Sequence, residues 1–141
     1  MIPDHIIIHH SLTKDNQTVS WNAIRKYHVE TNGWRDIGYH YGIELIGEHY
    51  ETLVGRMQNE IGAHCKEDSM NNRSLAICVL GNFDLVEVPA VQFALLIRLV
   101  RSLQECFRIP KEFVKRHTDY APYKSCPGSK FQWSRFINSI K

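Results

Sequence analysis

The sequence has no apolar run approaching the roughly 20 residues needed to cross a membrane, although 43% of its 141 residues are hydrophobic. Its first residues, Met1 to His5, lack the basic region and long apolar stretch of a secretory signal. We therefore expect a protein without a membrane span that is made in the cytosol. Internal repeats, low-complexity tracts and linkers are also missing, which predicts a single domain over residues 1–141, with no separate wall-binding domain.

Cysteine is scarce, and its spacing excludes two common kinds of site. None of the four cysteines forms a CxxC pair of the kind found in zinc ribbons and redox motifs. Without a secretory signal, a disulfide framework is not expected either. Cys78 and Cys106 lie in apolar segments and are predicted to be buried packing residues. Cys126 instead follows Lys124 in a polar loop, which makes it a candidate for chemistry.

Net charge is low, at +2, but it is unevenly distributed. Residues 1–100 contain eight Lys/Arg and twelve Asp/Glu, whereas residues 101–141 contain nine and three. A basic C-terminal region favours a polyanionic partner such as a cell-wall polymer or nucleic acid, and a solvated surface explains it equally well. Because no recognition helix or basic-aromatic motif is present, we do not expect nucleic acid as a partner.

Hydrophobic patterning predicts an α/β fold in which one central mixed β-sheet is flanked by helices. Pro89 opens the clearest helix, and Ser129 is expected to cap the last one, with Gln132 three residues on. The segment 55–72 lacks periodicity and is long enough to be a functional loop. The predicted strands are 5–9, 36–45, 49–53, 74–80 and 113–116; the predicted helices are 20–31, 89–107 and 129–140; and a polar loop is expected over 11–18.

The last third of the chain carries a histidine and a cysteine on one loop. His117 follows the last predicted strand, and Cys126 lies nine residues later at a Pro-Gly corner. His9 or His10, at the end of the first strand, can supply a third ligand from the far end of the sequence. Two His and one Cys with an open fourth position is the ligand count of a catalytic zinc site. A His and a Cys nine residues apart also occur by chance, and half-buried histidines usually bond to backbone groups. The surrounding motifs must therefore decide whether a metal site is expected.

Six motifs follow one another along nearly the whole chain. They are Ile8-His9-His10-Ser11-Leu12-Thr13, Gly33-Trp34-Arg35-Asp36-Ile37-Gly38-Tyr39-His40-Tyr41, Gly62-Ala63-His64, Asn72-Arg73-Ser74-Leu75-Ala76-Ile77, Gly81-Asn82-Phe83, and His117 through Lys124-Ser125-Cys126-Pro127-Gly128. Each motif is weak alone, but the ordered set is specific. It resembles the zinc-dependent N-acetylmuramoyl-L-alanine amidases related to peptidoglycan recognition proteins, particularly the amidase-type phage lysozymes.

The resemblance implies hydrolysis of the amide that joins the lactyl group of N-acetylmuramic acid to L-alanine. By position, the family's zinc ligands match His9, His117 and Cys126, and its catalytic residues match Tyr39 and Lys124. Because His9 is the histidine that aligns with the family's zinc ligand, the side chain of His10 should face the other side of the strand.

The remaining implied site residues line the substrate groove: His64 and Asn72, with Trp34 and His40 as less specific members. Two features depart from the common pattern. The segment between His117 and Cys126 carries one residue more than the common spacing, so this loop must bulge. Cys78 stands where some branches of the family carry a glutamate base, which is consistent with the branch that relies on a tyrosine.

The chemistry of these residue types agrees with the resemblance. Zinc held by two His and one Cys can lower the pKa of a water molecule from about 15.7 towards 7. The phenol of Tyr39 and the ammonium of Lys124 are suited to stabilise charge on the carbonyl oxygen. Without a catalytic role, Tyr39 would be an aromatic residue of the core and Lys124 a solvated loop lysine.

We expect a monomer whose partner is peptidoglycan or a muropeptide fragment. The resemblance favours a phage endolysin that reaches the wall through a holin-type membrane hole. The alternatives are a cytosolic amidase that recycles wall fragments and a protein that binds muropeptides without cutting them; the non-cutting members typically lack the cysteine ligand. Small phage amidases can also regulate a protein partner, but nothing in the sequence identifies one.

Overall fold

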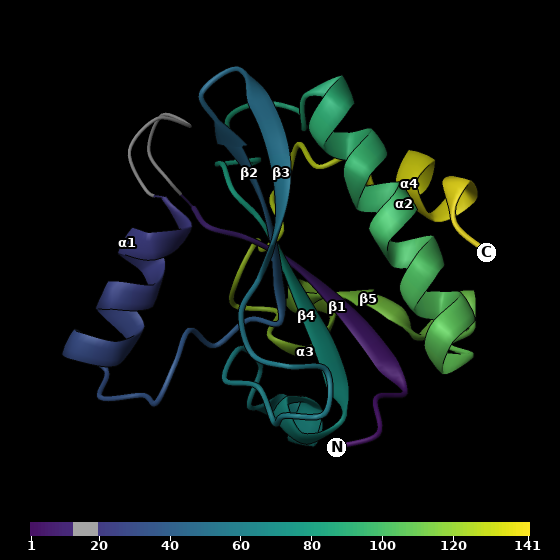
Figure 1. Cartoon of the computed structure of the whole chain (residues 1–141). Helices are drawn as coiled ribbons and strands as arrows, with labels where there is room; N and C mark the ends of the chain where they lie inside the picture. Colours follow the sequence, from purple (N-terminus) through teal and green to yellow (C-terminus); the bar gives the residue numbers. More distant parts are fainter. Residues whose placement is uncertain (13–19) are drawn as a thin grey trace.

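The computed structural model describes residues 1–12 and 20–141, which contain one five-stranded mixed sheet with helices on both faces (Figure 1). The polar loop expected over residues 11–18 therefore lies mostly outside the described residues. Strand β1 pairs in parallel with β4 and β5, β2 pairs in parallel with β4, and β2 and β3 form an antiparallel hairpin. The spatial order β3-β2-β4-β1-β5 confirms the predicted α/β class. The strands are β1 (His5–His10), β2 (Tyr41–Ile46), β3 (His49–Val54), β4 (Ser74–Val79) and β5 (Val114–Arg116).

Helices cover both faces of this sheet. Figure 1 shows α2 and α4 together on one side and α1 on the other. None of the helices in the described residues is long and apolar enough to span a membrane. The α-helices are α1 (Trp21–Lys26), α2 (Ala90–Phe107), α3 (His117–Tyr120) and α4 (Trp133–Ser139); a π-helical turn η1 (Tyr27–Thr31) extends α1, and 3-10 turns occur at η2 (Glu67–Asn72) and η3 (Lys111–Phe113).

Side-chain alternation along β1 separates the main core from the other face of the sheet. Ile6 and Ile8 belong to the large apolar cluster that includes the buried face of α2. Ile7 points the other way and packs with Met70 of the β3–β4 segment. Since side chains two residues apart share a face, His9 follows Ile7 onto that second face. The strand thus presents a histidine where the sheet is covered by loops rather than by α2.

A smaller apolar cluster anchors α1 to the second face. It contains Trp21 and Ile24 from α1, together with Cys78 of β4. Gly42 of β2 allows this approach, because a Cβ atom there would lie 2.4 Å from the Trp21 ring. Trp21 in turn lies 6.4 Å, between ring centroids, from Tyr39.

The predicted strand over residues 36–45 is wrong for its first half, because β2 begins at Tyr41. Two amides in this half bond to side chains instead of to a neighbouring strand: the Ile37 N–H donates to the Asp36 carboxylate, and the Gly38 N–H donates to His28 Nδ1. Tyr39 therefore lies in the connection that precedes β2, not on the strand.

Three further expectations differ from the structure. Ser129 does not cap the last helix, because its N–H donates to Asp84 and α4 begins only at Trp133. Cys106 is exposed on the outer face of α2 rather than buried. The helical turn α3, which starts at His117, replaces the beginning of the expected loop.

We predict that Gly42→Ala destabilises the protein by about 1–3 kcal/mol, since the added methyl group overpacks the contact between β2 and Trp21. Chemical denaturation of the purified variant measures this loss as a lower midpoint with an unchanged slope. A free energy of unfolding within about 0.5 kcal/mol of wild type would show that the Trp21 ring moves aside without cost.

The pair formed by Asp4 and Arg73 predicts a pH-dependent contribution to stability. Arg73 Nε lies 2.9 and 3.1 Å from the two Asp4 carboxylate oxygens, and hydrogen bonding to Arg73 lowers the pKa of Asp4 from 3.8 to about 2. Because the folded-state pKa is depressed, the stabilisation is complete above about pH 4 and is lost as the pH falls towards 2.

Both side chains of this pair are about half exposed, so we expect Asp4→Asn to cost only about 0.5–1 kcal/mol at pH 7. Denaturation of both proteins at pH 7 and pH 2 measures the difference, which should shrink towards zero at pH 2. A difference that persists at pH 2 would assign the effect to packing rather than to charge.

Candidate active site

The structure brings His9 and His117 together at the carboxyl ends of two neighbouring parallel strands. Ile8 of β1 is in register with Arg116 of β5, so the residues that follow them lie side by side. The centroids of the two imidazole rings are 4.5 Å apart. Ligands in sheets of this kind gather at the carboxyl ends of the strands, where loops deliver further groups.

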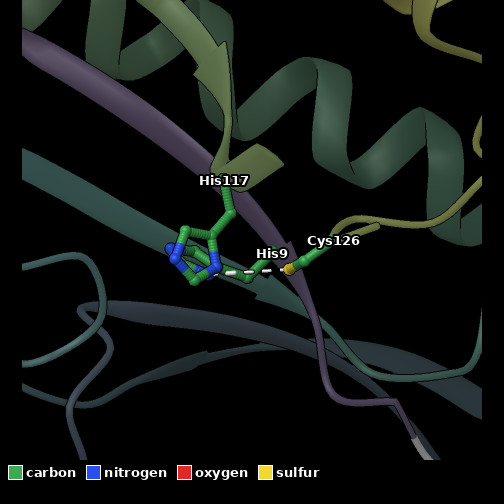
Figure 2. Close-up of side chains that lie close together, drawn as sticks. All are labelled: His9, His117 and Cys126. Atoms are coloured by element: carbon green, nitrogen blue, oxygen red, sulfur yellow. Dashed lines mark hydrogen bonds between the residues drawn. The ribbon is translucent and has the colours of Figure 1, made fainter. Parts of the chain in front are cut away.

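Cys126 reaches the same point from the loop after α3, as Figure 2 shows. The Thr118 N–H donates to the Cys126 carbonyl oxygen at 2.9 Å, which closes this loop. Cys126 Sγ lies 3.7 Å from His9 Nδ1 and accepts a hydrogen bond of 3.3 Å from the His10 amide. The potential ligand atoms of His9, His117 and Cys126 all lie within 4.8 Å of one another.

The separation of His9 and Cys126 fits a tetrahedral zinc ion. Bond lengths of about 2.0–2.1 Å to nitrogen and 2.3 Å to sulfur place two tetrahedral ligand atoms about 3.6 Å apart. The 3.7 Å between His9 Nδ1 and Cys126 Sγ matches that separation without rearrangement. Two imidazoles and one thiol leave a fourth position open, as catalytic rather than structural zinc sites do.

The electrostatic environment keeps the two histidines neutral, which is the form that binds metal. Burial lowers the pKa of His9 well below its ordinary value, and it lowers the pKa of His117 to about 4. Lys124 pushes both pKa values in the same direction. Burial also raises the pKa of the Cys126 thiol to about 12, so a bound metal must displace its proton.

Tyr39 packs against the candidate centre with its phenol protonated. Its ring lies 5.2 Å, between centroids, from the ring of His9. Burial and the thiols of Cys78 and Cys126 raise its pKa well above the ordinary value of a phenol. The backbone is held as well, because the Arg56 N–H donates to the Tyr39 carbonyl oxygen. Tyr39 is therefore a fixed hydrogen-bond donor beside the centre.

Lys124 lies at the rim of the same cavity on a tight turn, in which its N–H donates to the Ala121 carbonyl oxygen. Tyr123, the residue before it, is 70% exposed and donates its hydroxyl hydrogen to Glu67 at 2.5 Å. The longer segment between His117 and Cys126 thus folds as a turn that docks on η2.

A cavity of about 980 Å³ surrounds these groups, a size suited to a substrate larger than a single sugar. Among the predicted groove residues, His64 and Trp34 line it. His40 does not: it is fully buried, and its ring bonds to the Glu60 carbonyl and the Ala76 amide. Asn72 is exposed and also lies outside the cavity lining.

Sequence reasoning missed several residues that line this cavity, including Asn71, which stands where Asn72 was expected. The Asn71 side-chain oxygen accepts hydrogen bonds from the amides of His64 and Cys65. His28 falls in the helix predicted over residues 20–31, with no site role expected, yet its ring lies 5.8 Å, between centroids, from that of Tyr39. Its position on the helix face that carries Trp21 and Ile24 was the available signal.

Glu67 was also missed, and it lies next to His117. Its carboxylate, the Cys65 thiol and a ring nitrogen of His117 lie within 4.8 Å of one another. A carboxylate beside a ligating histidine is the usual outer partner that orients the imidazole. The only sequence signal for Glu67 was its place in the unpatterned loop at residues 55–72.

Comparison with known proteins agrees with this geometry. The sequence pattern of the N-acetylmuramoyl-L-alanine amidase family matches residues 1–129. The chain is 33% identical over 130 residues to an endolysin of Escherichia phage T7, an alignment that covers 88% of this chain and 80% of the relative. Among solved structures, an endolysin N-acetylmuramoyl-L-alanine amidase, LysCS from Clostridium intestinale, superposes with a TM-score of 0.85 at 29% identity and covers 100% of this chain and 86% of its own.

A peptidoglycan recognition protein of Drosophila, PGRP-LB, superposes with a TM-score of 0.76 at 25% identity over 92% of this chain and 78% of its own. The chain therefore belongs to the N-acetylmuramoyl-L-alanine amidase family. Within it, the chain is an amidase of the type that phage endolysins and peptidoglycan recognition proteins share.

Proposed function

We propose that this protein is a zinc-dependent phage endolysin which hydrolyses the amide bond between N-acetylmuramic acid and L-alanine in peptidoglycan. The observation that carries the proposal is the convergence of His9, His117 and Cys126 in a large cavity, with their ligand atoms within 4.8 Å of one another. The cysteine ligand favours cleavage over binding alone, because it completes a three-ligand site with an open position.

When bound to these ligands, zinc supplies Lewis acidity and makes a water molecule a usable nucleophile near neutral pH. The protein itself must orient the substrate and stabilise the negative charge that grows on the amide carbonyl oxygen. Tyr39 is placed to donate a hydrogen bond to that oxygen, because its phenol is protonated and lies beside the centre. Lys124, which also lines the cavity, can add an ammonium charge.

The cavity can receive both parts of the substrate around the scissile bond. Trp34 provides an aromatic surface suited to the apolar face of a sugar or peptide. Lys66 and Lys124 on the loops provide cations for the carboxylates of a stem peptide. Similarity to phage endolysins supports synthesis in the host cytoplasm followed by action on the wall, after release through a holin-type hole.

We expect purified protein to bind about one zinc ion per chain, to clear a suspension of bacterial walls and to expose new amino groups of L-alanine. A chelator should abolish the activity, and added zinc should restore it. Metal analysis, turbidity and amine labelling measure the three properties. New reducing sugar ends without new amines would identify a glycosidase and refute the proposal.

The same preparation separates the endolysin role from wall-fragment recycling. An endolysin should act on intact walls at a rate comparable to its rate on soluble muropeptides. A strong preference for soluble fragments would favour the recycling role, and binding to walls without any release of amines would favour the non-cutting alternative.

We predict that Tyr39→Phe and Lys124→Ala keep one zinc per chain but lower turnover by about 100- to 1000-fold, the usual cost of losing a donor to the developing oxyanion. Cys126→Ala should instead lose zinc and activity together. Zinc content and initial rates on the same wall preparation measure this contrast.

Lys130, which is exposed on the loop before α4, offers a matched control, because Lys130→Ala removes a lysine outside the cavity lining and should leave turnover unchanged. If Lys124→Ala also keeps wild-type turnover while Tyr39→Phe does not, the lysine has no role in the chemistry.

A further inference from the structure

A chain of hydrogen bonds runs from the backbone of η2 to the ring of His9. Ser74 Oγ lies 2.6 Å from the Met70 carbonyl oxygen and 3.3 Å from His64 Nε2. On the other side of the imidazole, His64 Nδ1 lies 3.0 Å from His9 Nε2. The remaining nitrogen of His9, Nδ1, faces Cys126 Sγ at 3.7 Å. Five groups from three parts of the sequence are thus joined end to end.

Ser74 sets the direction of donation along this series of hydrogen bonds. A serine hydroxyl has one hydrogen to donate, and a carbonyl oxygen can only accept. The short bond to the Met70 carbonyl therefore uses the hydrogen of Ser74. Its oxygen is left as an acceptor towards His64, so His64 must carry its hydrogen on Nε2.

The same count of donors and acceptors applies to the imidazole rings of His64 and His9. His9 must be neutral to bind a metal, and the neutral ring of His64 holds one hydrogen. With that hydrogen on Nε2, His64 Nδ1 can only accept, and His9 must donate from Nε2. The neutral ring of His9 then has a free lone pair on Nδ1, on the side of Cys126.

We propose that His64 is a positioning residue which, directed by Ser74, holds His9 in the Nε2–H tautomer and so presents Nδ1 as a ready-made metal ligand. This inference rests on the proposed zinc site and adds a role for His64 beyond lining the cavity. The opposite tautomer would place an N–H group where the metal must bind, and it would leave His64 Nδ1 facing a bare nitrogen.

The surroundings hold His64 in this arrangement. The Asn71 side-chain oxygen accepts from the His64 amide at 2.7 Å, which fixes the backbone. Gly62 makes room for the ring, because a Cβ atom there would lie 2.6 Å from His64 Cδ2. The planes of the His64 and His9 rings are nearly perpendicular, at 88°, with 5.0 Å between their centroids. Ser74 is fully buried, and no solvent competes for its hydroxyl.

Loss of an outer partner of this kind typically lowers metal affinity by about 10- to 100-fold. We therefore expect His64→Leu to bind zinc about 10- to 100-fold more weakly than wild type, in competition with a chromophoric chelator. His64→Asn should recover most of the affinity, because its side-chain oxygen can take the place of Nδ1 as the acceptor. His49→Leu makes the same chemical change on exposed β3 and should bind zinc like wild type.

Nitrogen-edited NMR of the histidine rings in zinc-free protein tests the tautomer directly. Wild type should show His9 protonated on Nε2 only. In His64→Leu, and to a lesser degree in Ser74→Ala, the Nδ1–H form should become populated. Circular dichroism confirms that each variant is folded, and the wild-type spectrum alone decides the question if a variant fails to fold.

The outcomes separate the two proposals. If wild type binds no zinc, the proposed metal site fails, whatever the tautomer. If wild type binds zinc but shows His9 protonated on Nδ1 before zinc is added, or if His64→Leu binds zinc as tightly as wild type, the role of His64 is overturned while the metal site stands.

Discussion

Parallel pairing of β1 with β5 is the constraint on which the candidate site depends. It aligns two chain segments that are more than 100 residues apart, so that His9 and His117 leave the sheet side by side. The alternation of side chains then decides which histidine of the pair in β1 faces the cavity. A slip of one residue in this register would exchange His9 with His10 and direct the wrong ring to the centre. The core beneath α2 therefore sets the register of the site as well as the stability of the fold.

The site also buries several polar side chains, and nearby residues supply their hydrogen-bond partners. Histidines in contact with one another would repel if charged, and burial keeps them neutral. Neutral rings need both a donor and an acceptor partner, and the β3–β4 segment and the first residue of β4 supply these through His64, the backbone of η2 and Ser74. The segment without apolar periodicity is thus needed for the polar groups that it supplies to these rings.

Much of the fold could be predicted from the sequence because the strong patterns are local. The apolar runs in β1 and β4 and the stripe in α2 determine their own secondary structure, and the ordered motifs single out His9, His117, Cys126, Tyr39 and Lys124 in advance. The structure brings these five residues around one cavity. What could not be predicted depends on contacts between segments. Tyr39 was expected on a strand, because its aromatic neighbours suit one, whereas the side chains of Asp36 and His28 take the amides before it. Asn71 and Glu67 have no periodic pattern around them, and their roles follow only from what they touch.

The contact between Tyr123 and Glu67 has a consequence for how such proteins can diverge. The first residue belongs to the loop between His117 and Cys126, and the second to η2, so each loop is the docking surface of the other. Neither loop is then free to change length independently, because a shortened partner would leave a tyrosine hydroxyl or a carboxylate without its hydrogen bond. In a chimera that exchanges loops between related amidases, these two segments should come from the same parent protein. They should be transplanted together, even though Tyr123 and Glu67 are 56 residues apart in the sequence.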